Sequence, residues 1–139
     1  MISFSQAVIS DRLQALTRAI DASDSPGKLL IYSEPVPLPG QPAGAAMQLC
    51  ALSFPKPSLS GVAGKVLTLL NPAPSLVIAT GTAAWARLVS GNGDYVADLD
   101  VGLPLSAAAV RLNNGADPLS LNLYAGGEIT VTLATLQEV

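Results

Sequence analysis

The sequence predicts a mainly β protein, an antiparallel β-sandwich of about eight strands preceded by one N-terminal α-helix. From Lys28 to Val139, short apolar segments alternate with turns rich in Gly, Pro and Asn, a pattern typical of a sandwich or barrel. Residues 5–22 instead repeat their apolar side chains at helical spacing. The 139 residues are enough for one core. We therefore expect a single domain over 1–139, with the helix at 5–22 and the sandwich at 28–139.

The first element is an amphipathic helix. Its apolar residues share one helical face and are Ile9, Leu13, Leu16 and Ile20. Ser5 and Ser10 are both possible N-caps, and the segment from Ser23 to Gly27 ends the helix because it contains Pro26. The flexible hinge would let the helix lie against its own domain or a different subunit. We expect it to pack on its own domain, because an exposed apolar stripe is costly.

A first strand is expected over 28–33, followed by a loop over 34–42. Four prolines in this loop fix φ and remove backbone donors, namely Pro35, Pro37, Pro39 and Pro42, so an extended surface segment is expected rather than a strand. We interpret it as a stiff connection or an arm lying across a neighbour. A polyproline II ligand is the alternative.

Further strands are expected between turns that contain Gly, Pro or Asn: 46–54, 65–70, 75–79, 82–90, 95–101, 107–112, 119–124 and 128–136. A hairpin is expected where Asn92-Gly93 connects 85–89 to 95–100, since Asn-Gly supplies the positive φ of a tight reversal. Alternation puts Tyr95 on one face with Ala97, Leu99 and Val101. It leaves open whether Trp85 faces the core or a partner.

A second hairpin is expected near the end of the chain. Alternating leucines at 119, 121 and 123 precede Ala125-Gly126-Gly127, and alternating Ile129, Val131 and Leu133 follow it. This pattern predicts two antiparallel strands that share one buried face.

Composition favours contact with other proteins over nucleic acid or membrane. Only 12% of the residues are charged, well below the ~25% of an ordinary soluble domain, so we expect a partner to cover part of the surface. The seven basic residues are scattered and the net charge is −3, which argues against nucleic acid. The chain shows no secretory signal and no membrane-length apolar run. We therefore expect synthesis in a cytoplasm.

The chemical inventory predicts no enzyme, cofactor or metal. Histidine is absent, which removes the commonest catalytic base. The lone cysteine, Cys50, lies among apolar residues and is expected to be buried. Asp94, Asp98 and Asp100 form the densest acidic group, and Asp98 and Asp100 could act as an acid and base pair or bind Ca²⁺. We favour an ordinary solvated strand face, with Arg87 as a cross-strand partner.

Three stretches resemble small structural proteins of tailed bacteriophages: the opening helix with its exit, Arg12 to Leu29; the central Ala79–Val89; and the ending around Leu119–Asn122 with Ala125–Val131. The resemblance is to the jelly-roll cement proteins that decorate icosahedral capsids, of the short-tailed phage type. It implies a jelly roll bound to the outer surface of the virion, clamping major capsid protein subunits, with self-association as a dimer or trimer. The proline-rich loop is longer than this family suggests.

The resulting functional hypothesis is a cement, or capsid decoration, protein without turnover, made in the cytoplasm of a bacterial host. The alternative is a carbohydrate-binding sandwich of a phage tail, fibre or neck that uses Trp85, Tyr95 and the Asp98 and Asp100 face, and a hydrolase using the two carboxylates is third. Interface residues are expected where apolar groups meet a neighbour: Phe4, Ile9, Pro35, Pro37, Pro39, Trp85 and Tyr124.

Overall fold

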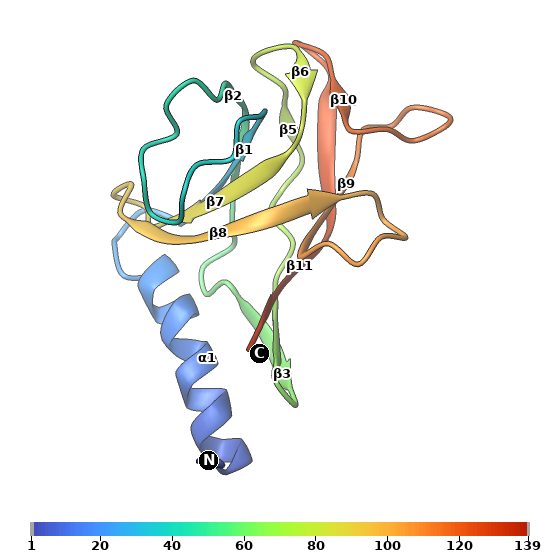
Figure 1. The fold of residues 1–139 in the computed structure, drawn as a ribbon. Helices are drawn as coiled ribbons and strands as arrows, with labels where there is room; N and C mark the ends of the chain where they lie inside the picture. The colour runs from blue at the N-terminus through green and yellow to red at the C-terminus, as the bar shows by residue number, and fades with distance from the viewer. Residues whose placement is uncertain (1, 139) are drawn as a thin grey trace.

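The structure, a computed structural model, describes residues 2–138 and confirms a mainly β, sandwich-like fold with an N-terminal helix (Figure 1). The helix is α1 (Gln6–Ile20). The strands are β1 (Lys28–Tyr32), β2 (Gln48–Ser53), β3 (Leu59–Ala63), β4 (Val66–Leu69), β5 (Ser75–Leu76), β6 (Gly81–Thr82), β7 (Trp85–Val89), β8 (Tyr95–Gly102), β9 (Val110–Asn113), β10 (Asn122–Leu123) and β11 (Glu128–Gln137).

One strongly curled sheet makes both walls of the sandwich. Its strands follow the order β2-β1-β7-β8-β9-β11-β4-β3, while β5 adds to β11, and β6 and β10 form a separate pair. The pairs are antiparallel except β8 with β9, which runs parallel. In Figure 1, β7 and β8 cross the front of the molecule, and α1 extends downward from them to the N-terminal end.

The core fills the space inside the curl. Leucine and isoleucine from nearly every long strand are fully buried there, including Leu29, Ile31, Leu52, Leu88, Leu112 and Ile129. Helix α1 adds Leu13, Thr17 and Ile20 and lies against β3, β4 and β8. The expected packing of the helix on its own domain is therefore confirmed.

The helix ends where its flanking residues cap it. Ser5 is the N-cap, since its hydroxyl accepts a hydrogen bond from the Val8 amide at 3.3 Å. At the other end, the Asp21 carboxylate accepts a hydrogen bond from the Ser58 amide at 3.1 Å. Gly27 then passes so close to Ile20 that any side chain there would overlap it. The chain is thus tied to the core on both sides of the hinge.

The expected β7–β8 hairpin is confirmed, but one face of β8 was assigned wrongly. Arg87 pairs with Asp98 and Val89 pairs with Tyr95, so Val96 is an extra residue in the ladder. With one extra residue in the strand, the side chains before a bulge of this kind lie on the opposite face from the one that simple alternation with the later residues predicts. Tyr95 consequently lies with Arg87, whose guanidinium is 5.1 Å from the ring centroid, and not with Ala97 and Leu99.

The expected hairpin between 119–124 and 128–136 is wrong. Only Asn122–Leu123 is a strand, and it pairs with β6, whereas β11 pairs with β5, β9 and β4. The polar side chains explain this choice. Thr82 donates to Asn122 Oδ1 at 2.8 Å, and Asn114 Nδ2 donates to Ser120 Oγ and the Asn122 carbonyl, each at 3.1 Å. These bonds hold the segment as a loop that turns away from β11.

Strand β3 was not expected from the sequence, and several expected strands are shorter. Leu59–Ala63 contains Gly61 and follows Pro55 and Pro57, which weakens its local β signal. Pairing with β4 forms the strand nonetheless. The expected strand at 82–90 is divided into β6 and β7, and β9 begins at Val110 rather than Ala107.

Candidate functional site: an apolar groove beside a proline-rich strap

The proline-rich loop closes on itself and lies over the sheet. The Ser33 amide donates to the Met47 carbonyl, and the Met47 amide donates to Ser33 Oγ, both at 3.0 Å. Residues 34–46 between these contacts form a compact loop with adjacent ends, which we call the strap. The expectation of a non-strand surface loop at 34–42 is confirmed.

Two hydrogen bonds fasten the strap to the outer face of β7 and β8. Arg87 donates to the Gln41 carbonyl at 2.7 Å, and the Gly40 amide donates to Asp98 Oδ2 at 3.4 Å. Gly40 has a φ of 76° and lies against the Tyr95 ring, a conformation that glycine adopts without strain. The strap therefore has a defined position.

An ion pair lies beneath the strap. Arg87 Nε is 2.7 Å from Asp98 Oδ1, and Arg87 Nη2 is 3.0 Å from Oδ2, a two-bond geometry that strengthens such a pair. The side chains are 12% and 15% exposed. The hydrogen bond to Asp98 raises the pKa of Arg87. The expected cross-strand pairing of Arg87 with the acidic face is confirmed, and Asp98 serves to hold the arginine.

Trp85 is covered rather than presented to solvent. Its ring stacks on Tyr32 with centroids 4.4 Å apart, its Nε1 donates to the Ser33 carbonyl at 2.9 Å, and the residue is 2% exposed. The Arg87 guanidinium lies 5.2 Å from the ring centroid on the same outer face. The ring therefore supports the strap and the ion pair in this chain, and offers no open face to a partner.

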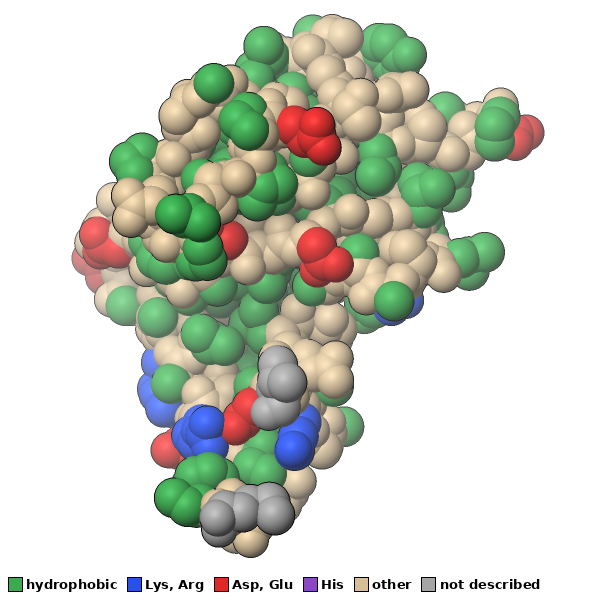
Figure 2. All heavy atoms as spheres, viewed as in Figure 1, with side chains coloured by type: hydrophobic (Ala, Val, Ile, Leu, Met, Phe, Trp, Pro, Cys, Tyr) green, Lys and Arg blue, Asp and Glu red, His purple; other side chains and the backbone are tan. Residues whose placement is uncertain are grey.

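Three pockets that share lining residues adjoin one another beside β8, and we call them together the groove. The pocket nearest α1 has a volume of about 400 Å³ and includes Leu13 and Leu16. It shares Leu99 and Asp100 with a pocket of about 270 Å³ under the strap. That pocket shares Val36 and Ala84 with a third, of about 650 Å³, beside β6. Figure 2 shows hydrophobic side chains in the hollow between the lower, helical end and the upper lobe.

The charged side chains that line the groove are all acidic. They are Glu34, Asp98 and Asp100, and no Lys or Arg lines the three pockets in the part of the chain described. Arg87 neutralises Asp98. Asp100 Oδ1 accepts a hydrogen bond from the Ala109 amide at 3.0 Å but has no ion pair among residues 2–138. The groove is suited to an apolar group that carries a positive charge.

The lone cysteine lies in the core and does not line the groove. Cys50 is buried, as expected, its Sγ contacts the Leu76 carbonyl at 3.4 Å, and burial raises the pKa of its thiol. A raised pKa leaves little nucleophilic thiolate near neutrality. Within residues 2–138, no three metal-ligating side chains gather in one place. No helix in that range is long and apolar enough to cross a membrane.

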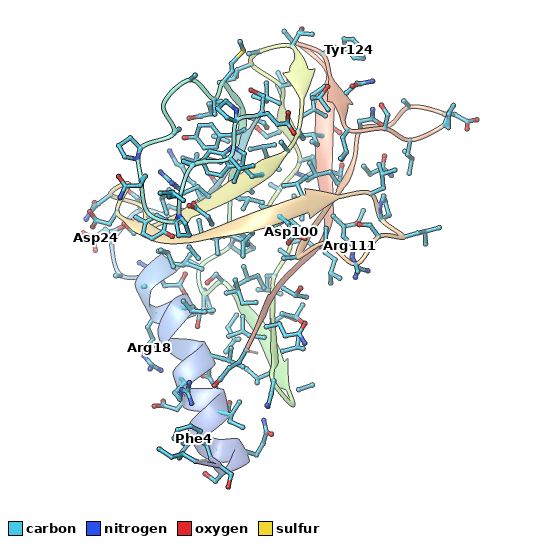
Figure 3. All side chains as sticks on the ribbon, viewed as in Figure 1. Phe4, Arg18, Asp24, Asp100, Arg111 and Tyr124 are labelled. Atoms are coloured by element: carbon cyan, nitrogen blue, oxygen red, sulfur yellow. The ribbon has the colours of Figure 1, made fainter. Side chains whose placement is uncertain are left out.

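The expected interface residues lie at separate places. Figure 3 shows Phe4 at the lower end of the molecule and Tyr124 at the opposite end, and the two residues are 49% and 65% exposed. Ile9 is half-buried on α1, and Pro35 and Pro39 are exposed on the strap, with Pro37 half-buried. The groove itself was missed. Its signal in the sequence was the pairing of a proline-rich loop with an Asp-x-Asp strand, but nothing local shows that the loop folds over that strand.

Comparison with known proteins adds no relative: no family model matches the chain, and neither a curated protein nor a solved structure matches it.

Proposed function

We propose that the chain is a viral structural protein, a cement or decoration protein that binds the outer surface of a phage capsid and stabilises contacts between major capsid protein subunits. The observation that carries this proposal is a set of exposed large hydrophobic side chains on a weakly charged domain. These residues include Val36 and Leu38 on the strap, Leu76 and Ile78 near β5, and Tyr124. Exposed apolar side chains that gather in one patch commonly mark a surface that another protein covers.

The strap is the best candidate for contact with the capsid. Leu38 is 76% exposed and sits on a loop that hydrogen bonds hold in place. Because the loop is already ordered, binding would cost little conformational entropy. A protein that binds only the assembled shell shifts the assembly equilibrium toward that shell by mass action. Many copies of such a small contact would together stabilise a capsid.

Co-sedimentation with capsids tests the proposal directly. The purified chain is mixed with mature capsids made from the major capsid protein encoded in the same genome. We expect saturable binding to the capsids. Leu38→Ser should weaken binding by about tenfold if the strap is a central contact, whereas Leu105→Ser, a matched change at a fully exposed leucine on another loop, should not. A chain that never sediments with capsids would show that the proposal is wrong.

The carbohydrate-binding alternative gains no support from the site. Sugar-binding surfaces use exposed aromatic faces, and Trp85 is covered by Tyr32 and the strap. Tyr95 is partly exposed but lies over Arg87. The hydrolase idea lacks a free carboxylate pair, because Asp98 already binds Arg87 at 2.7 Å. We therefore carry only the assembly function forward.

A further inference from the structure

The lower end of the molecule carries a small apolar projection. It consists of Ile2, Phe4 and Val8, which precede or begin α1 and are all exposed, together with Lys65 in the turn between β3 and β4. We call these four residues the knob. Gln6 Nε2 donates to the Gly64 carbonyl at 2.7 Å, which joins the start of the helix to that turn. The knob is therefore a fixed feature, built from two segments.

Both basic and acidic side chains lie beside the knob. The Arg12 guanidinium stacks on the Phe4 ring, 4.6 Å from its centroid, and pairs with Glu138 at 2.7 Å. Lys65 is exposed and has no ion pair within residues 2–138. Figure 2 shows Lys and Arg side chains at this end with acidic side chains among them, and further acidic side chains in the upper half.

The knob and the groove have complementary character. The groove has apolar walls, including Leu99 and Val36, and an acidic rim formed by Glu34 and Asp100. The knob offers apolar side chains with a free positive charge at Lys65. Figure 3 places Phe4 far below Asp100 on the same molecule, so a chain cannot fill its own groove.

We propose that the knob of one copy docks in the groove of a second copy. Phe4 and Ile2 enter the apolar part of the groove, and Lys65 meets the carboxylates of Glu34 and Asp100. This contact joins two different surfaces, so a pair of copies still has one free knob and one free groove. Such head-to-tail contacts produce a ring when the rotation closes and an open chain when it does not.

The contact is small, so self-association in solution should be weak. A few apolar side chains and one charge pair correspond to the low end of interface sizes, below ~1,200 Å². Copies held side by side on a common scaffold would associate far more strongly, because tethering raises their effective concentration. The proposal does not depend on a capsid as that scaffold, and it can fail or hold independently of capsid binding.

Sedimentation velocity at rising protein concentration tests the contact with two complementary variants. The knob variant is Phe4→Ser. The groove variant is Glu34→Lys with Asp100→Lys, which repels Lys65, and Glu34→Lys alone is a milder version that breaks no side-chain hydrogen bond found in residues 2–138. Circular dichroism and urea unfolding verify that each variant is folded. We expect the wild type to form concentration-dependent oligomers and each variant to raise the dissociation constant by about tenfold or more.

Mixing the two variants gives the decisive result. The knob variant keeps an intact groove, and the groove variant keeps an intact knob, so an equimolar mixture should form a 1:1 dimer and nothing larger. Tyr124→Ser, at the other end of the molecule, should associate as the wild type does. A wild type that stays monomeric up to about 1 mM, or oligomers that survive Phe4→Ser, would overturn the proposal. So would a mixture of the two variants that contains only monomers.

Discussion

The ion pair beneath the strap gives the sharpest test of how this fold is held together. Asp98→Asn removes the negative charge and leaves the Arg87 guanidinium without its partner. Breaking a buried pair costs about 3–5 kcal/mol, and an exposed pair is worth about 0–1 kcal/mol. At 12% and 15% exposure the pair lies near the buried limit. Arg87 retains the Gln41 carbonyl and two aromatic faces, so we expect a loss of about 2 kcal/mol.

Urea unfolding at pH 7 measures this loss. With a slope of about 2 kcal/mol per molar urea, the transition midpoint should fall by about 1 M. Trp85 fluorescence provides a second signal, because a loosened strap should expose the indole and shift its emission to longer wavelength. Asp11→Asn is the matched control. It breaks the Arg18–Asp11 pair, whose side chains are 59% and 77% exposed, and should leave the midpoint unchanged within error.

A double-mutant cycle decides whether the loss belongs to the pair. Arg87→Met, Asp98→Asn and the combined variant are unfolded under the same conditions. Side chains in direct contact show coupling energies of about 0.5–3 kcal/mol, and the two-bond geometry at 2.7 and 3.0 Å favours the upper part of that range. A coupling below about 0.5 kcal/mol would refute the reasoning, because the pair would then behave as an exposed one.

Two further predictions concern the core and the hinge. Burial raises the pKa of the Cys50 thiol, so the folded protein should resist alkylation at pH 8 and react only when urea unfolds it. The stability that the protonated thiol contributes is fully present at a pH below the pKa of the thiol in the unfolded chain, and it is lost as the pH rises through the pKa of the thiol in the folded protein. The free energy of unfolding should therefore decline above about pH 9, and Cys50→Ala should lessen that decline. A Cβ at Gly91 would overlap the Ser25 carbonyl and Ser23 Oγ, so Gly91→Ala should cost about 1–3 kcal/mol. Gly61→Ala, which meets nothing within 4 Å, is the control, and equal midpoints for the two variants would contradict this reading.

The elements with strong local signals were predictable. Ser5 and the spacing of Leu13 and Ile20 predicted the helix, and the structure places it within two residues at each end. Asn92-Gly93 predicted the β7–β8 turn, where Gly93 has a φ of 88°. These signals lie within a few residues of one another, so they act whatever the rest of the chain does.

The failures come from interactions between distant segments. Leu119 to Leu123 alternate as a strand should, but Asn114 binds that segment from outside it and keeps most of it as a loop. The bulge at Val96 is likewise set by the partner strand β7. Alternation along one segment shows which residues could share a face. It does not show which neighbour will pair with them.

The groove could not be predicted because the strap creates one of its sides. The sequence shows prolines at 35, 37 and 39 and carboxylates at 98 and 100, which are more than fifty residues apart. The strap and β8 are held together by Arg87, which donates hydrogen bonds to both the Gln41 carbonyl and the Asp98 carboxylate. Nothing local to Arg87 distinguishes it from the scattered basic residues elsewhere, so its role appears only in the folded chain.

The placement of this ion pair explains how a weakly charged protein could serve as an assembly module. The chain has seven basic and ten acidic residues, and it places one of each beneath a surface loop rather than on the open surface where charge aids solubility. There the pair holds Val36 and Leu38 in position while both side chains face water. Holding a contact loop rigid lowers the entropy cost of binding. Stability and partner affinity should therefore depend on the same pair, and under the proposed function Asp98→Asn should weaken binding to capsids as well as lower the urea midpoint.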